Sequence, residues 1–74
     1  MTTRELAARV ATVGKRIEQI REGNGIETAD LARRAGIARS TLQRIEHGQS
    51  ANVSVATLFK IANALTVAPG ELVK

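Results

Sequence analysis

The first third of the chain carries apolar residues at the spacing of an α-helix. Their steps alternate between four and three residues, which keeps them on one stripe of a helical surface. Thr2 and Glu5 stand three residues apart, the spacing of a capping box, so we expect the helix to begin near the start of the chain. The stripe consists of Leu6, Val10, Val13, Ile17 and Ile20.

Glycines interrupt this stripe and then end it. Gly14 lies in its middle, and the letters GNG at residues 23–25 place two strong helix breakers after it. Two interpretations follow from this pattern. The segment is either one long helix or an N-terminal arm of residues 1–12 hinged at Gly14 to a helix over residues 14–22.

Shorter helical patterns fill the rest of the chain. Residues 28–35 predict a second helix, and residues 38–47 predict a third one that Gly48 closes. Ser54 can cap a fourth helix, and Pro69 suits the first turn of a final helical turn. We therefore expect an all-α fold of five helices in a single domain of residues 1–74. The inward positions of the second and fourth helices are Leu31, Ala32, Ala35, Leu58, Ile61, Ala62 and Leu65.

Composition narrows the functional classes. The chain has no cysteine and one histidine, and its carboxylates are scattered, so we expect no metal, no cofactor and no enzymatic activity. No apolar run is long enough to span a bilayer, and no signal sequence precedes the first helix, so we expect a cytoplasmic protein without membrane contact. The net charge of +4 suits a polyanionic partner, although it suits plain solubility as well.

Residues 28–47 have the pattern of a helix-turn-helix motif. Such a motif needs a small residue where its two helices cross, and Ala32 provides it. It also needs a turn residue that tolerates a positive φ, and Gly36 follows four positions later. The inner positions of both helices are apolar, at Leu31, Ala35, Ile37, Leu42 and Ile45.

The outer face of residues 38–47 contains two arginines and no acidic residue. Arginine donates two hydrogen bonds to the O6 and N7 edge of guanine in the major groove of DNA. This face could also be only the solvent-exposed side of an amphipathic helix. The helix-turn-helix pattern around it favours a surface that reads DNA bases. The residues of the face are Arg39, Ser40, Gln43, Arg44 and His47.

The chain resembles the Cro/repressor-type (XRE-like) helix-turn-helix family, whose domains have the lambda-repressor-like fold. The resemblance covers residues 13–74. It rests on VGKRI at residues 13–17, IR at 20–21, LA at 31–32, GI at 36–37, STL at 40–42, RIEHG at 44–48 and TL-KIA-AL at 57–65. The tail that includes NVS at 52–54, Pro69 and EL at 71–72 also resembles the controller proteins of restriction–modification systems.

The resemblance implies a function and site residues. Family members regulate transcription as homodimers on palindromic operators in double-stranded DNA, and controller proteins regulate their own gene. RNA polymerase is a further expected partner if the chain activates transcription. By the resemblance, Arg39, Ser40 and Arg44 read bases with Gln43 as a neighbour, Thr28, Gln49, Ser50 and Asn52 contact the DNA backbone, and Arg21 and Glu46 form a partly buried ion pair.

The sequence departs from the family at three positions. Members usually carry glutamine where this chain has the shorter Thr28, so a familiar contact with a phosphate or base is missing here. They carry serine or threonine caps where this chain has Glu27 and Ala38. We therefore expect the recognition helix to lack a side-chain cap.

A second apolar stripe on the fourth helix has two interpretations. Val55 and Phe59 lie one turn apart and either enlarge the core or, with Leu72 and Val73, form a dimer interface, which the resemblance favours. Residues 1–12 exceed the family minimum. If the first helix includes them, Leu6 and Val10 need cover, which a partner subunit can provide.

Two other functional classes remain as alternatives. An antitoxin of this fold would have a toxin protein as its main partner and bind DNA secondarily, although only residues 1–12 are available here to wrap a toxin. A small phage or plasmid repressor would belong to the same class of DNA-binding proteins.

Overall fold

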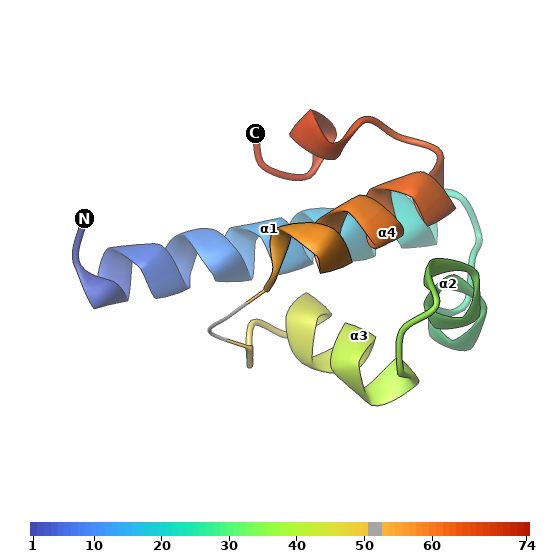
Figure 1. Ribbon diagram of the computed structural model, residues 1–74, viewed down its shortest axis with the longest axis horizontal. Helices are drawn as coiled ribbons and strands as arrows, with labels where there is room; N and C mark the ends of the chain where they lie inside the picture. The colour runs from blue at the N-terminus through green and yellow to red at the C-terminus, as the bar shows by residue number, and fades with distance from the viewer. Residues whose placement is uncertain (51–52) are drawn as a thin grey trace.

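The computed structural model describes residues 1–50 and 53–74, and within them every regular element is helical (Figure 1). The expected all-α helix-turn-helix fold is confirmed, with one difference in the helix count. The fifth element is a 3-10 helix of three residues rather than an α-helix. The elements are α1 (Thr3–Gly23), α2 (Thr28–Ala35), α3 (Arg39–Glu46), α4 (Val55–Leu65) and η1 (Pro69–Glu71).

Helix α1 is a single long helix that continues through Gly14, so the structure has no hinged arm. The capping box begins it: the Glu5 amide donates to the Thr2 hydroxyl oxygen at 3.1 Å, and the Glu5 carboxylate accepts from the Thr2 amide. Its 21 residues span about 31 Å at the usual helical rise, close to the 34 Å long axis of the molecule. Figure 1 shows its N-terminal half projecting beyond the other helices.

The turn between α2 and α3 has the geometry that the sequence indicates. Gly36 adopts a left-handed conformation with a φ of 70°, a region that suits glycine because it has no Cβ. The next amide, of Ile37, donates to the Ala32 carbonyl oxygen at 3.0 Å. Glu27 and Ala38 precede α2 and α3, and no described side chain caps either helix. The turn therefore fixes the angle between the two helices through backbone geometry.

The core lies where all the helices meet. Helix α1 packs against α3, α2 packs against both α3 and α4, and η1 packs against α4. The C-terminal segment lies on the opposite side of α1 and α4 from α3 (Figure 1). The side chains that are fully buried in this core are Ile17, Leu31, Leu42, Ile61 and Leu72.

The position of Leu72 corrects an expectation from the sequence. We expected this residue at a dimer interface, but it is only 1% exposed in the monomer. The 3-10 turn before it folds the chain back over α1 and α4, and Glu71 anchors this turn. The Arg16 guanidinium donates to the Glu71 carbonyl oxygen at 3.2 Å, and its charge lies 3.7 Å from the Glu71 carboxylate.

Candidate nucleic-acid interface

The approach of α1 to α3 positions the helix that carries the exposed arginines. Gly14 is buried at this crossing. A Cβ atom at Gly14 would collide with the carbonyl oxygen of Ile45 and lie 2.9 Å from its carbonyl carbon and 3.3 Å from the Cα of Glu46. Only glycine therefore permits this separation between the two backbones. From the sequence we interpreted Gly14 as an interruption of the helix and missed this packing role.

A buried ion pair joins the same two helices. The Nε and Nη2 atoms of Arg21 donate to the two carboxylate oxygens of Glu46 at 2.8 and 3.1 Å. The third nitrogen, Nη1, donates to the carbonyl oxygen of Ile26 at 2.8 Å. Arg21 is 9% and Glu46 5% exposed. The structure thus brings together the two residues that the resemblance pairs, in the two-pronged geometry that suits arginine and carboxylate.

This pair also determines the charge of α3. The hydrogen bonds that Arg21 donates to the Glu46 carboxylate raise the pKa of Arg21 above its ordinary value, against the opposing effect of burial. The charge of Glu46, the acidic residue of α3, is therefore neutralised inside the domain. The exposed surface of α3 is left with the positive charges of Arg39 and Arg44.

The predicted base-reading residues lie together on the outside of α3. Arg39, Ser40 and Arg44 are exposed, whereas Gln43 is partly buried. Leu42 and Ile45, on the other side of the helix, are buried in the core and hold it in place. The eight residues of α3 are about 12 Å long, and the major groove of B-DNA is about 12 Å wide. The arrangement can present two guanidinium groups and a hydroxyl to base edges.

The predicted backbone-contacting residues flank this helix. Thr28 begins α2 and is partly buried, Gln49 is exposed after α3, and Ser50 is partly buried. Asn52 lies outside the described residues. Because no described side chain caps α2 or α3, the first amides of both helices remain available to water or to an anion such as phosphate.

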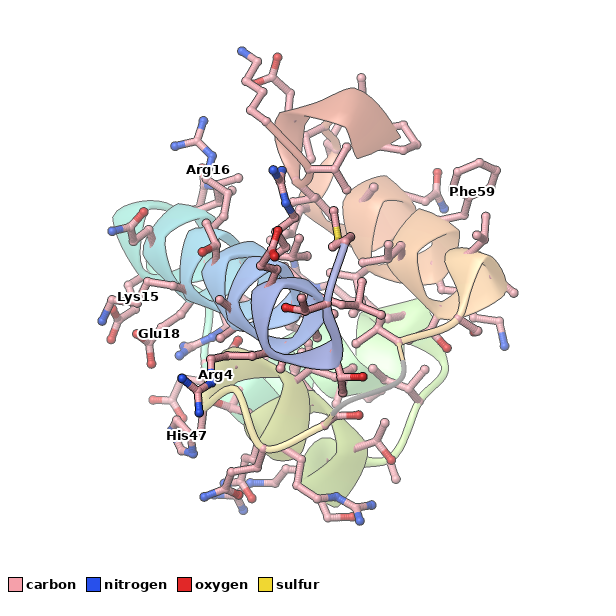
Figure 2. All side chains as sticks on the ribbon, turned by 90° about the vertical axis from the view of Figure 1, so that its left-hand side faces the viewer. Arg4, Lys15, Arg16, Glu18, His47 and Phe59 are labelled. Carbon is pink, nitrogen blue, oxygen red and sulfur yellow. The ribbon has the colours of Figure 1, made fainter. Side chains whose placement is uncertain are left out.

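Large apolar side chains are exposed on the outer face of α4 and near the C-terminus. Val55 is 66% and Phe59 56% exposed, and Val73 near the C-terminus is 57% exposed. Figure 2 shows Phe59 pointing away from the body of the protein, on the other side of the view from His47, which follows α3. The structure thus leaves three of the four predicted interface residues exposed, and Leu72 is the one that it buries.

Metal sites and membrane-spanning helices would indicate other functional classes. Within residues 1–50 and 53–74, no group of three or more His, Cys, Asp or Glu side chains has the arrangement of a metal site. In the same part of the chain, no helix combines the length and the apolar character needed to cross a membrane.

Comparison with known families matches most of this domain. The family described as the Cro/C1-type HTH DNA-binding domain matches residues 16–74. The HTH-type transcriptional regulator SinR of Bacillus subtilis (strain 168) is 38% identical over 55 residues, and so is SinR of Bacillus licheniformis. Those 55 residues are 74% of this chain and 50% of each relative. The chain therefore spans about half the length of the curated relatives that it matches.

Two solved structures share the fold. The restriction–modification controller protein C.AhdI from Aeromonas hydrophila is 35% identical with a TM-score of 0.84, and the match covers 88% of this chain and 97% of that one. SinR, described as the master regulator for biofilm formation and solved in complex with DNA, is 35% identical with a TM-score of 0.80. That match covers 84% of this chain and 98% of the SinR chain.

Proposed function

The chain belongs to the family of Cro/C1-type HTH DNA-binding domains, and on this premise we propose that it is a sequence-specific transcriptional regulator. It binds a palindromic operator as a homodimer. The observation that carries this proposal is the exposed face of α3, where Arg39, Ser40 and Arg44 stand together without an acidic neighbour. The match to SinR, a protein whose structure includes DNA, supports the same use of the fold.

In the proposed complex, α3 lies in the major groove. Arg39 and Arg44 donate paired hydrogen bonds to guanine edges, and Ser40 contacts a base or phosphate between them. Gln43 has a lesser role because it is partly buried. Thr28 and the uncapped amides at the start of α2 bind one phosphate group. Gln49, Ser50 and Asn52 contact the DNA backbone on the other side of α3.

Removal of either arginine tests this assignment. We expect Arg39→Ala or Arg44→Ala to raise the Kd for the preferred duplex about 5- to 150-fold, because a good bidentate base contact is worth about 1–3 kcal/mol. Each variant should also lose the base preference at one position of each half-site. Fluorescence anisotropy with the preferred duplex and its single-base variants measures both effects.

Arg34→Ala is the matched control, because it removes the same charge from an exposed position on α2. It should weaken binding to preferred and unrelated duplexes by the same small factor and leave the base preference intact. If Arg39→Ala and Arg44→Ala also lowered binding equally on every sequence, neither arginine would be a base-reading residue.

The dimer forms through the outer face of α4 in this proposal. Val55, Phe59 and Val73 are large apolar residues exposed at the surface, as in an interface between subunits. Two copies related by a twofold axis can present their α3 helices to half-sites about one turn of DNA apart. The overlap with 97% of C.AhdI further supports a controller protein that regulates its own gene.

Phe59→Ala is expected to weaken dimerisation and operator binding together. A buried aromatic residue at the centre of an interface commonly contributes about 2 kcal/mol or more, so the dimer Kd should rise by about thirtyfold. Because Phe59 is 56% exposed in the monomer, the melting temperature of the monomeric variant in dilute solution should change little. Sedimentation velocity over a concentration series measures the dimer Kd. An unchanged sedimentation profile would rule out this interface.

A further inference from the structure

The first part of α1 extends the core stripe onto a surface that the monomer does not cover. We call residues 3–13 of α1 the N-terminal extension. Its apolar residues continue the helical line of Ile17, which is completely buried. Along this line burial decreases from Val13 and Val10, which are partly buried, to Leu6, which is 50% exposed. The apolar spacing of a core-facing helix therefore extends beyond the part of α1 that packs in the core of the monomer.

A groove runs beside this extension. Its volume is about 390 Å³, and the last residues of the chain form its opposite wall. Four of its lining residues are apolar, and Arg9 and Lys74 are charged. The Lys74 ammonium lies 3.1 Å from the Glu71 carboxylate, which also lies 3.7 Å from the Arg16 guanidinium. The groove is lined by Leu6, Arg9, Val10, Thr12, Val13, Val73 and Lys74.

The extension also forms a helix in a place where the monomer gives it little support. Residues 1–9 are all exposed, and the family match begins only at residue 16. Helical turns without tertiary packing are marginally stable in water. The capping box of Thr2 and Glu5 nevertheless encodes a helix start at this distance from the body. The sequence thus specifies helical turns that pack little against the rest of the monomer. This indicates that a partner covers their apolar side chains.

The area that a stable dimer interface needs indicates which molecule covers this apolar face. A stable interface buries about 800 Å² on each subunit, contributed by about 20–30 residues. The exposed side chains of Val55, Phe59 and Val73 supply only a small part of this area. Val73 lines the groove together with Leu6 and Val10, so an interface that includes Val73 reaches the groove.

We propose that a second copy of the chain occupies this groove, so that the N-terminal extension is a dimerisation arm. The inference rests on the homodimer proposed above and adds a contact that the family match does not include. Since a twofold interface uses the same surface on both subunits, each copy places its extension against the other. The arm buries Leu6 and Val10 and enlarges the interface beyond Val55, Phe59 and Val73.

Two substitutions in the extension test this arm. Leu6→Glu places a charge in the groove, whereas Ala8→Glu places the same charge on an exposed residue that does not line it. Both positions are exposed in the monomer, and glutamate is a good helix former, so the monomer fold should be kept in both. We expect Leu6→Glu to raise the dimer Kd by at least about tenfold, because the interface would bury a charged carboxylate in place of an apolar side chain. Ala8→Glu should stay within about twofold of the unmodified chain.

Sedimentation velocity of both variants, with Phe59→Ala measured in parallel, separates the possible failures. If Phe59→Ala dissociates the dimer and Leu6→Glu does not, the arm is absent while the proposed regulator stands. If Leu6→Glu and Ala8→Glu weaken the dimer equally, the effect does not depend on the groove and the arm is again overturned. An unmodified chain that stays monomeric at every concentration contradicts the arm together with the homodimer.

Cysteine labelling provides a second test that needs no disruptive charge. The chain has no cysteine, so Leu6→Cys and Ala8→Cys each introduce a unique thiol. We expect alkylation of Leu6→Cys to slow as the protein concentration rises through the dimer range, while Ala8→Cys keeps a constant rate. A constant rate for Leu6→Cys would overturn the proposal.

Discussion

Glu46→Ala is expected to lower the free energy of unfolding by about 3–5 kcal/mol, because it leaves the buried charge of Arg21 without its partner. The guanidinium would lose two of its three hydrogen bonds and keep only the one to the Ile26 carbonyl oxygen. A chain of this length without cysteines rarely draws more than about 3–5 kcal/mol of stability from its single core. The variant should therefore be largely unfolded under mild conditions.

DNA binding by Glu46→Ala should be lost through unfolding rather than through a missing contact. Urea titration followed by circular dichroism measures the stability, and anisotropy measures DNA binding on the same sample. Asp30→Ala is the control: its ion pair with Arg33 has a similar distance of 3.0 Å, but both side chains are more than half exposed. It should cost less than about 1 kcal/mol. A Glu46→Ala variant that unfolds like the parent and yet fails to bind DNA would refute this explanation.

Gly14→Ala is expected to lower the free energy of unfolding by about 2 kcal/mol, because overpacking at the upper end of its range costs about 3 kcal/mol. The added methyl group would meet the backbone of Ile45 rather than a flexible side chain, so α1 and α3 must move apart. This loss outweighs the gain of about 1 kcal/mol that alanine normally brings to a helix interior. Because α3 carries the arginines, affinity for DNA should fall as well.

Gly23→Ala provides the matched control for this prediction. It makes the same change in the same helix, and among the described residues no atom outside its chain neighbours and the nearby backbone of α1 lies within 4 Å of the new methyl position. It should leave stability unchanged or raise it by up to about 1 kcal/mol. Thermal melting compares the two variants, and a shift of the same sign and size in both would show that Gly14 has no packing role.

The helix-turn-helix part of the fold could be predicted from the sequence because its signals are local. Gly36 with a buried Ala32 four positions earlier indicates the turn, and the predicted bounds of α2 are those of the structure. The exposed side of α3 follows from helical periodicity, since Leu42 and Ile45 fix which face is inside. The base-reading assignment itself came from the family resemblance.

The remaining features depend on contacts between distant parts of the chain. Arg16 and Glu71 are 55 positions apart, and no local pattern pairs them. Leu72 looked like an exposed residue because the sequence does not reveal that η1 folds back over the core. A glycine within a helical stripe can be either a hinge or the site where a second helix crosses closely. Only the position of α3 in the structure shows that Gly14 is such a crossing. A glycine inside an otherwise regular stripe was the available signal.

Selection of binding sites from random duplex DNA tests the central claim most directly, with the affinity of the selected duplexes then followed against salt concentration. We expect an enriched palindrome whose half-sites lie about one DNA turn apart, bound at least about a thousandfold more tightly than bulk DNA. Binding that is equal on all sequences and driven only by salt would contradict it. The exposed face of α3 would then bind DNA only through its positive charge. An interaction module whose main partner is a protein would become the better proposal for the function.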